Sequence, residues 1–594
     1  MTPPVTSADL SGQGGPVDEP GVTSISSPTA GSGGEPAGLP DVLTGARPVG
    51  YRRVALTVPP AALAPRAQAL LDSGFRIALI SGHDAASSLA DRDGTSGTAP
   101  VPDAGAHTMR VVYLFTQPTT DQRVELHLRC DPADPHVPSL AGLSFAAGRF
   151  EREMRDLFGI VPDDHPMPSR MVRHFHWPTG WHPMLSGAGE PPPFGDVDGP
   201  FSFRIVEGTG VYEIPVGPVH AGMIGPGHFR FSVVGETILN LKARLWFVHR
   251  GIEKLFETRP PAQGIELAER ISGDTSVGHT LAFCQAVEDA CATTVSVTDR
   301  QVRAILLELE RLYNHVTDIG SLCNDVGHSI LNNQAQRVKE DLLRVNDRVT
   351  GSRLLRGGVR LGGVSVLSLP DPARLAEIGS DIAEIAALAL GHSVVRDRFT
   401  GTAVLTRQQA VDLGTLGYVA RASGLTVDAR RDHPVPGVPA PPVREDTTDG
   451  DVLSRFLLRV NEIEESVSLI TDLVARVRTA SGEHAGSVQH PGSVLHPGSV
   501  QHPGSVLHPG SVLHPGSVQQ PTRTAGSGVG IVEGWRGTIV HRVEIQDGLL
   551  TRVKIVDPSF FNWPALPVAL ADTIVPDFPL ANKSFNLSYA GNDL

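Results

Sequence analysis

Residues 302–319 constrain the fold of this chain more than any other stretch of the sequence. Their apolar side chains recur at the i, i+3, i+4, i+7 spacing that marks one face of an α-helix. The same spacing returns at 336–349, 374–390 and 452–474. Helices of this length bury their apolar faces against one another, so the sequence predicts a helical bundle.

The chain has 594 residues, which is too long for one ordinary domain and suits two or three. A net charge of −14 argues against nucleic acid as a partner, because phosphate binding needs clustered Lys and Arg. No apolar run reaches the roughly 18–20 residues of a membrane helix, and the N-terminus lacks the pattern of a secretory signal. We therefore expect no direct membrane span, and a disordered tail at 1–48 that is rich in Gly, Pro, Ser and Thr.

The cysteines are few and scattered. Only Cys130, Cys284, Cys291 and Cys323 occur, and none forms a C-x-x-C pair. This pattern is typical of a reduced, cytoplasmic protein rather than of a disulfide framework. It also argues against an iron–sulfur cluster or a zinc site held by cysteines of this chain.

We predict an α+β fold class with two folded domains and a Gly/Pro-rich linker at 185–200. The first domain, at 49–184, is small, with a mostly consecutive sheet. The second, at 201–486 and 522–594, is mainly a helical bundle with a small sheet at its start. The expected strands are 51–57, 76–81, 109–115 and 124–130 in the first domain and 201–206, 211–216 and 229–234 in the second, with a helix at 61–73, a loop at 91–105 and a hairpin-like alternation at 528–556.

Residues 487–521 repeat a hexapeptide of the type His-Pro-Gly-Ser-Val-Leu/Gln. Proline and glycine in every repeat preclude a helix, and one apolar pair per repeat is a thin core for a β-solenoid. Regularly spaced histidines could bind metal weakly. We favour the other interpretation, a disordered low-complexity insertion into the second domain.

The first motif with a specific signature covers 150–160 and reads Phe-Glu-Arg-Glu-Met-Arg-Asp-Leu-Phe-Gly-Ile. It predicts a charged helical turn that is closed by Gly159. Together with His165, Arg170 and the Trp-Pro-Thr-Gly of 177–180, it resembles the C-type subunit of NADH:quinone oxidoreductase. That resemblance implies that the first domain is a non-catalytic structural partner.

Two histidines lie in a Gly/Pro-rich turn between predicted strands. His220 ends Gly-Pro-Val-His, and His228 stands in Gly-His-Phe-Arg-Phe. Such a turn can place a histidine at the mouth of a cavity. These two motifs resemble those of the D-subunit family of the same enzyme, above all its membrane-hydrogenase branch of the formate-hydrogenlyase type. The resemblance implies a quinone-pocket or proton-relay role for both histidines, and the alternative is that they are structural residues of a tight loop.

The third motif reads Glu-Arg-Ile-Ser-Gly-Asp-Thr-Ser-Val-Gly-His and resembles the nickel–iron hydrogenase pattern Arg-x-Cys-Gly-x-Cys-x-x-x-His. Arg270, Gly273 and His279 fit that pattern, whereas Ser272 and Thr275 stand at its two cysteine positions. Soft thiolates hold nickel in those enzymes, and an alcohol that stays protonated is a poor substitute.

Asp274 is an unusual carboxylate in this loop, where it could bind a proton or a cation or cap the loop. Quinone-reducing D subunits place a quinone-bonding tyrosine where Gly273 stands here, so this chain departs from their pattern. From the resemblance we expect Asp274 and His279 to be catalytic. We also expect His220, His228 and Arg270 to face a quinone-side pocket, and no residue to bind metal.

The C-terminal segment shows the same loss of cysteine. The hydrogenase pattern Asp-Pro-Cys-x-x-Cys resembles 557–562, but Ser559 and Asn562 occupy its cysteine positions. Both thiolate pairs are therefore missing, and no nickel–iron centre is expected. Between the motifs, Glu310 and His315 lie on the first predicted bundle helix. They either form buried pairs that fix helix packing or, by the resemblance, begin a proton pathway.

Together the motifs resemble a fused C/D-type subunit of NADH:quinone oxidoreductase, or equally the large subunit of a formate-hydrogenlyase-type membrane hydrogenase. The resemblance implies an oxidoreductase subunit peripheral to the cell membrane on its cytoplasmic side, taking part in electron transfer toward quinone or another acceptor coupled to proton or ion movement. The implied partners are a small subunit with a 4Fe–4S cluster and antiporter-like membrane subunits. The alternative is a redox-inactive coupling subunit. No Gly-x-Gly-x-x-Gly follows a predicted strand, so NADH oxidation is expected in other subunits.

Overall fold

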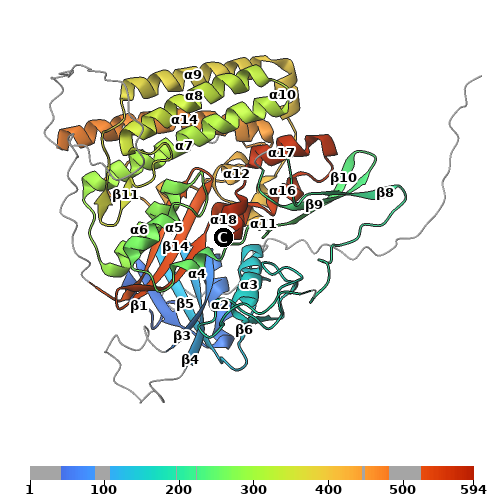
Figure 1. Ribbon diagram of the computed structural model, residues 1–594, viewed down its shortest axis with the longest axis vertical. Coiled ribbons are helices and arrows are strands. Elements are labelled where there is room, and N and C mark those ends of the chain that lie inside the picture. Colours follow the sequence, from blue (N-terminus) through green and yellow to red (C-terminus); the bar gives the residue numbers. More distant parts are fainter. Residues whose placement is uncertain (1–41, 87–106, 196, 222–223, 444–447, 481–522) are drawn as a thin grey trace, which may run out of the picture.

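The computed structural model describes residues 42–86, 107–195, 197–221, 224–443, 448–480 and 523–594. Within them, a small sheet domain lies beneath a second domain that ends in a layer of long helices (Figure 1). The predicted repeat at 487–521 and the predicted loop at 91–105 lie outside the described residues, as does most of the predicted tail. The first strand begins at Arg47, slightly before the boundary that composition suggested.

The first domain is built on a five-stranded sheet in the order β1-β2-β5-β4-β3. Its strands are β1 (Arg47–Gly50), β2 (Arg53–Thr57), β3 (Arg76–Ala86), β4 (His107–Gln117) and β5 (Gln122–Cys130). The helix α2 (Pro60–Asp72) carries the chain from β2 to the far edge, and the antiparallel meander β3-β4-β5 returns beside β2. The meander is consecutive as expected, but the parallel pairing of β2 with β5 was not foreseen.

The charged motif of the first domain forms α3 (Phe145–Phe158), which packs against β3. Gly159 ends this helix at φ 74°, a left-handed conformation that glycine adopts without steric cost. The predicted closure of the helix at Gly159 is therefore confirmed. A short parallel pair, β6 (His136–Pro138) and β7 (Val161–Asp163), flanks the helix.

The second domain contains the predicted bundle. It is formed by α7 (Val297–Asp325), α8 (Ser329–Thr350), α9 (Pro372–Gly391) and α14 (Val452–Ala480). The four apolar stretches in the sequence lie within these four helices, which confirms the prediction. α7 is buried on almost every side because it contacts α8 and α14 in the bundle and also α6 and α17 in the layer beneath (Figure 1).

None of the helices in the described part of the chain has, by itself, the length and hydropathy of a membrane span. α9 and α10 (Ser393–Phe399) reach that combination only when taken together, and they are bent by 86° at their junction. α9 packs against α8 and α14 and buries Leu375, Ile378, Ile382, Ile385, Ala386 and Ala389.

Two antiparallel sheets of three strands complete the second domain. The first consists of β8 (Val211–Val216), β9 (His228–Val234) and β10 (Thr237–Arg244), and it projects from the molecule (Figure 1). The second is the meander β13 (Gly526–Gly534), β14 (Gly537–Gln546) and β15 (Leu549–Val556), as the alternation at 528–556 predicts. The remaining elements are α4 (Ile252–Phe256), α5 (Pro261–Ala268), α6 (Ser276–Cys291), β11 (Val359–Arg360), β12 (Gly363–Val364), α11 (Arg407–Leu413), α12 (Gly417–Ala422), α13 (Ala429–Asp432), α15 (Pro558–Asn562), α16 (Ala565–Ala569), a 3-10 turn (Val575–Asp577), α17 (Phe578–Phe585) and α18 (Tyr589–Asp593).

The strand predicted at 201–206 is wrong. This segment alternates like a strand, but it has no ladder partner among the described residues. Its two aromatic rings stack on guanidinium groups instead: Phe201 lies 4.7 Å from that of Arg244, and Phe203 lies 4.4 Å from that of Arg230. Cation–π contacts of this kind hold the segment against the neighbouring sheet without backbone pairing.

Glycines let α6 lie directly on the strand β13. A Cβ atom at Gly528 would overlap the carbonyl oxygen of Ala286, and one at Gly530 would overlap that of Ala282. Alternate positions of a strand face the same side, and alanines four residues apart share a helix face. The two backbones therefore pack without intervening side chains, which fixes the position of α6 and of the loop before it.

Buried ion pairs join the two domains. Glu125 on β5 is fully buried and bonds Arg53 at 2.8 Å and Arg542 on β14 at 3.0 Å. Glu544, also on β14, bonds Arg110 of β4. Burial would raise the pKa of each carboxyl, but the arginines outweigh it and hold both pKa values well below the usual range. The domains therefore meet as a charged interface whose ionised carboxylates are paired.

Candidate functional site

The loop before α6 is organised around the carboxylate of Asp274. Its Oδ1 accepts hydrogen bonds from Ser272 Oγ at 2.9 Å and from Thr275 Oγ1 at 3.0 Å. Arg536 binds the same carboxylate with two nitrogens, each at 2.7 Å from an oxygen. A bidentate guanidinium–carboxylate pair is among the stronger polar contacts in proteins. Asp274 thus ties both replaced cysteine positions of this loop to the β13–β14 turn.

Arg536 is held on all sides. Its side chain is 4% exposed, against 40% for that of Asp274. Its guanidinium lies 3.9 Å from the ring centroid of Trp535, and its Nε donates to the carbonyl of Asn586 at 2.6 Å. Burial opposes ionisation of Asp274, but the charge of Arg536 prevails and lowers the pKa of Asp274 to about 2. The pair is therefore ionised throughout the physiological range.

A second set of hydrogen bonds links this loop to the C-terminus. Ser272 Oγ lies 2.8 Å from Ser588 Oγ, and the backbone N–H of Ser588 donates to Ser559 Oγ at 2.9 Å. Ser588 is the N-cap of α18, where its hydroxyl accepts from the N–H of Gly591. Two positions that are cysteines in the hydrogenase pattern, 272 and 559, are thus bridged through one serine.

His279 lies at the end of the first turn of α6 and is completely buried. Its Nε2 is 3.0 Å from Asp557 Oδ2, and its Nδ1 is 3.0 Å from His541 Nε2. Burial raises the pKa of Asp557, but the hydrogen bond and charge of His279 reverse this and lower it. Burial also holds the pKa of His541 well below 6.5, so His541 is neutral at pH 7. The triplet joins α6, β14 and α15 inside the protein, and His279 does not reach an open surface.

Glu310 of α7 caps the N-terminus of α6. Its two carboxyl oxygens accept from the N–H groups of Val277 at 2.7 Å and Gly278 at 2.9 Å. Such groups are otherwise unpaired at a helix start. Burial raises the pKa of Glu310 to about 8 despite these bonds, and the neighbouring charge of Asp274 adds to the rise. A buried carboxyl that carries a proton at neutral pH therefore lies beside the ionised Asp274.

The expected quinone-side histidines lie together in the β8–β9 turn. His220 Nε2 lies 2.7 Å from the carbonyl of Gly227, and His228 Nδ1 lies 3.1 Å from that of Gly217. The turn approaches α18 closely, because a Cβ atom at Gly227 would lie 2.7 Å from the ring of Tyr589. The histidines hold their own turn, and that turn packs on the helix whose cap binds the loop of Asp274.

Arg270 and Gly273 border the loop on its outer side. The side chain of Arg270 is 52% exposed and donates to the carbonyl of Glu266 at 2.7 Å. Gly273 is exposed, and a Cβ atom placed on it would meet nothing within 4 Å. Open space therefore lies where the resemblance puts a quinone-bonding tyrosine.

The four positions at which the hydrogenase pattern has cysteines do not suit a nickel–iron centre in this chain. They carry Ser272, Thr275, Ser559 and Asn562, which are neutral oxygen and amide groups rather than soft thiolates. Each is already engaged: the hydroxyls make the bonds given above, and the Asn562 amide binds both backbone groups of Leu416, at 2.8 and 3.1 Å. Within the described residues, no group of three or more His, Cys, Asp or Glu side chains is arranged to hold a metal ion.

Sequence reasoning missed Arg536, Trp535 and Ser588. The first two stand between glycines in Gly-Trp-Arg-Gly at the β13–β14 turn, and two large side chains in so short a turn were a usable signal. Ser588 had no such signal. Its role depends on α18 folding back onto the loop of Ser272, which is not visible in the sequence.

Comparison with known proteins identifies the family of this chain. The family model of the respiratory-chain NADH dehydrogenase 49 kDa subunit matches residues 325–593, and the family model of the 30 kDa subunit matches residues 56–187. Hydrogenase-4 component G of Escherichia coli (strain K12) is 31% identical over 475 residues, which cover 78% of this chain and 77% of that protein. The chain belongs to the family of respiratory-chain NADH dehydrogenase 30 and 49 kDa subunits. The resemblance seen in the motifs is thereby confirmed, and with it the α+β fold class.

Other relatives in this family are oxidoreductase and hydrogenase subunits. Formate hydrogenlyase subunit 5 of E. coli (strain K12) is 31% identical over 58% of this chain, and the match spans 63% of its own length. The C/D-type subunit of NADH-quinone oxidoreductase from Phocaeicola vulgatus is 27% identical over 63% of this chain and 77% of that protein. A chain of the membrane-bound sulfane sulfur reductase, an archaeal respiratory membrane complex, shares the fold (TM-score 0.54, 21% identity, 65% of this chain and 98% of that chain).

Proposed function

We propose that this chain is a peripheral subunit of a membrane-associated respiratory-type oxidoreductase complex. The loop before α6 with its contacts Arg536, Ser559 and Ser588, which we call the loop cluster, takes part in electron transfer toward quinone or another acceptor. This transfer is coupled to proton or ion translocation and proceeds without a nickel–iron centre. One observation carries the proposal: the loop before α6, α15 and α18 meet in a network of hydrogen bonds. This network includes Ser272, Thr275 and Ser559, all at positions that are cysteines in the hydrogenase pattern.

The acceptor we favour is a quinone, whose carbonyl oxygens accept hydrogen bonds. His220 and His228 each use one ring nitrogen on a turn carbonyl, so the other nitrogen becomes a donor only when the imidazole is protonated. Arg270 is a permanent donor on the loop that carries Asp274. The open space at Gly273 lies on the same loop, and it supports an acceptor there.

We assign the proton transfer in this proposal to Glu310. It holds a proton at neutral pH, and the negative charge of Asp274 helps to keep it there by raising the pKa of Glu310. Behind it, buried ion pairs continue along α7 to α14, where His315 lies 2.8 Å from Glu462 and Arg459 lies 2.9 Å from Asp318. Chains of buried titratable groups are a means of moving protons when the charge at one end changes.

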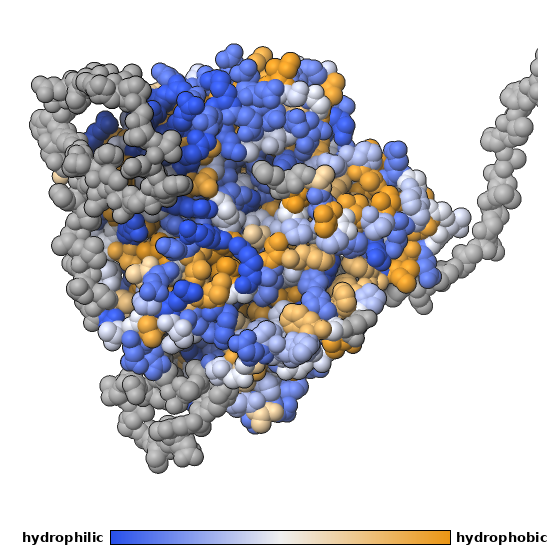
Figure 2. Space-filling view, viewed as in Figure 1, coloured by the Kyte–Doolittle hydropathy of each residue, from blue (hydrophilic) through white to orange (hydrophobic). Residues whose placement is uncertain are grey.

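An exposed apolar surface supports a role within a complex. Figure 2 shows apolar residues gathering over β9, β10 and the α16–α17 region, while the outer face of the bundle is hydrophilic. Val219 is 87% exposed and Ile224 51% exposed in the β8–β9 turn, and Leu239 and Ile574 are exposed at the other end of the same sheet. Surfaces of this kind mark contacts between proteins. We assign it to a small iron–sulfur subunit that holds a 4Fe–4S cluster, with antiporter-like membrane subunits completing a complex on the cytoplasmic side of the cell membrane.

One observation favours a second function, a redox-inactive coupling subunit. His220 and His228 bind their own turn, and His279 is buried in internal contacts. These histidines then serve only to fix the loops, and the chain links its partners without touching an acceptor.

The first test is a joint measurement of iron, nickel and quinone in the purified complex. Iron and quinone without nickel are expected. Nickel in stoichiometric amount on this subunit would contradict the proposal, because it requires ligands other than those at the four replaced positions.

A substitution separates the two functions. His220→Ala removes a ring at the proposed acceptor side and is expected to lower quinone reduction by the complex at least tenfold, about 1.4 kcal/mol. His392→Ala, an exposed histidine beyond the end of α9, is the matched control and should have no effect. Unchanged quinone reduction in both variants, with assembly intact, would favour the coupling subunit.

A further inference from the structure

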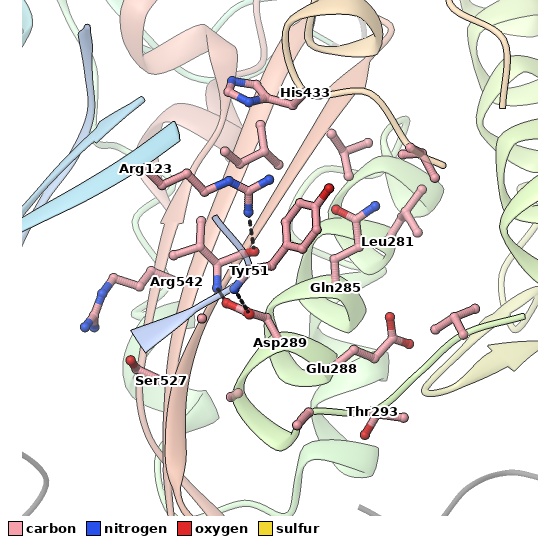
Figure 3. A pocket seen from close by; sticks show the side chains of 18 of the residues that line it. Tyr51, Arg123, Leu281, Gln285, Glu288, Asp289, Thr293, His433, Ser527 and Arg542 are labelled. Carbon is pink, nitrogen blue, oxygen red and sulfur yellow. Dashed lines mark hydrogen bonds between the residues drawn. The ribbon is translucent and has the colours of Figure 1, made fainter. Parts of the chain in front are cut away.

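A cavity of about 880 Å³ lies at the seam between the two domains. Its walls come from β1 and the turn after it, the end of α6, the start of α7, residues 433–439 after α13, and the start of β13. Figure 3 shows Tyr51 projecting into it between Arg123 and Gln285. Ser272, Asp274 and His279 do not line this cavity, so it is separate from the loop cluster described above.

Two carboxylates of α6 that line the cavity are paired with arginine. Glu288 binds Arg303 through both oxygens, at 2.6 and 2.9 Å. Asp289 binds Arg53 at 3.2 Å and accepts from the backbone N–H of Tyr51 at 2.8 Å. These pairs stabilise the α6 wall, and the arginines offset the charge of both carboxylates.

The polar groups that remain in the walls include several donors. Among them are the side chains of Tyr51, Gln285, Thr293 and Arg300, for which the described residues provide no hydrogen-bond or ion-pair partner. Tyrosine and threonine hydroxyls, an amide and a guanidinium supply several N–H and O–H groups, and arginine adds a positive charge that is present at every physiological pH. A cavity whose described walls offer these donors and the charge of Arg300 suits a ligand rich in anionic oxygen.

Tyr51 adds a surface for a planar ring. It is 48% exposed, and the guanidinium of Arg123 lies 5.5 Å from its ring centroid. The facing wall includes the apolar side chain of Leu281 (Figure 3). Aromatic rings favour offset or edge contacts with one another, so the exposed part of Tyr51 is a stacking platform.

We propose that this cavity binds a nucleoside phosphate, with its base against Tyr51 and its phosphate toward Arg300. The volume lies within the roughly 300–1,000 Å³ of small-molecule sites, and such sites occur preferentially at domain interfaces. Tyr51 belongs to the first domain and Arg300 to the second, so one ligand contacts both. Binding therefore stabilises the docked arrangement of the two domains.

The test is calorimetric titration of the purified full-length chain with three probes. ADP carries both a base and phosphates, adenosine carries only the base, and inorganic phosphate only the charge. ADP is expected to bind and to raise the melting temperature, while adenosine and inorganic phosphate each bind at least about tenfold more weakly. Absence of both heat and a melting shift with ADP up to about 5 mM overturns the proposal, and so does binding of phosphate alone as tight as that of ADP.

Substitutions locate the site. Arg300→Ala and Tyr51→Ala should each weaken ADP binding by about tenfold or more, whereas Tyr51→Phe, which keeps the ring, should retain most of it. Arg337→Ala, on the surface of α8, removes the same charge outside the cavity and should bind ADP like the wild type. The melting temperature without ligand shows whether each variant is folded. ADP binding that survives in both folded alanine variants assigns the nucleotide to another place and rejects this site.

Discussion

Asp274 and Arg536 form an ion pair in the loop where the hydrogenase pattern has its first two metal-binding cysteines. The carboxylate gathers the hydroxyls of Ser272 and Thr275, and the guanidinium comes from a turn distant in sequence. The network is complete within the chain. The assignment of Asp274 and His279 as catalytic residues stays a prediction, since the geometry equally suits a structural role.

We predict that Asp274→Ala lowers the free energy of unfolding by about 1–3 kcal/mol, because it leaves the buried Arg536 without its carboxylate. The value is below that of a fully buried pair, since Asp274 is partly exposed. Urea unfolding measures it. Asp472→Ala removes a carboxylate from an exposed pair with Arg476 on α14 and should change the stability little. Equal losses of unfolding free energy in the two variants would show that the Asp274–Arg536 pair stabilises the protein no more than an exposed ion pair does.

The raised pKa of Glu310 predicts that the free energy of unfolding depends on pH. Its pKa is raised in the folded state to about 8. Its contribution to the free energy of unfolding is therefore fully present below pH about 4.5 and is lost as the pH rises toward 8. The loss amounts to at most about 5 kcal/mol, from 1.36 kcal/mol per pKa unit. Glu310→Gln cannot ionise, so its unfolding free energy should fall less than that of the wild type between pH 5 and 8.

The control for this pH prediction is Glu384→Gln, an exposed glutamate on α9, which should follow the wild-type pH profile. Chemical denaturation at several pH values gives the comparison directly. Parallel profiles for the wild type and Glu310→Gln would mean that Glu310 ionises normally in the folded protein.

At the scale of elements, the contact between α6 and β13 depends on glycine. Gly530→Ala should lower the unfolding free energy by about 3 kcal/mol, because its new Cβ overlaps the carbonyl of Ala282 and forces two backbones apart. Gly273→Ala is the matched control: the same methyl group enters open space on a neighbouring loop. Thermal unfolding of the two variants gives the comparison, and an unchanged midpoint for Gly530→Ala would refute the packing argument.

The helices could be predicted well because their evidence is local. Apolar residues every three or four positions define the buried face of α7 wherever its partners lie. The same reasoning failed at 201–206, where local alternation resembled a strand. A strand needs a neighbouring edge as well as a pattern, and in this segment the rings of Phe201 and Phe203 bind arginines instead.

At the scale of the whole molecule, the fused domains depend on ion pairs that neither domain could complete alone. Glu125 and Arg53 come from the first domain, and Arg542 comes from the second. Arginines buried at such an interface are costly without their carboxylate. This interface makes the two domains a single unit and encloses the cavity of Tyr51 and Arg300.

We predict that Glu125→Gln destabilises the docked domains by about 3 kcal/mol, because it leaves the charges of Arg53 and Arg542 unbalanced. Calorimetry should show the single unfolding transition broadening or separating into two as the domains uncouple. Glu384→Gln, an exposed glutamate of α9 with the same charge change, should leave the transition unaltered. A single, unshifted transition for Glu125→Gln would show that apolar contacts alone hold the domains together.

The sequence by itself determined the family, the bundle helices, the helix end at Gly159 and the residue types in each motif. These depend on spacing along the chain, which periodicity and motif order reveal. Only the tertiary structure decided which groups meet. The bond between Arg536 and Asp274 joins residues 262 positions apart, and neither the parallel pairing of β2 with β5 nor the cavity at the domain seam has a local signature. Such contacts arise when distant segments bury their surfaces together, and no short stretch of sequence records which partner each will find.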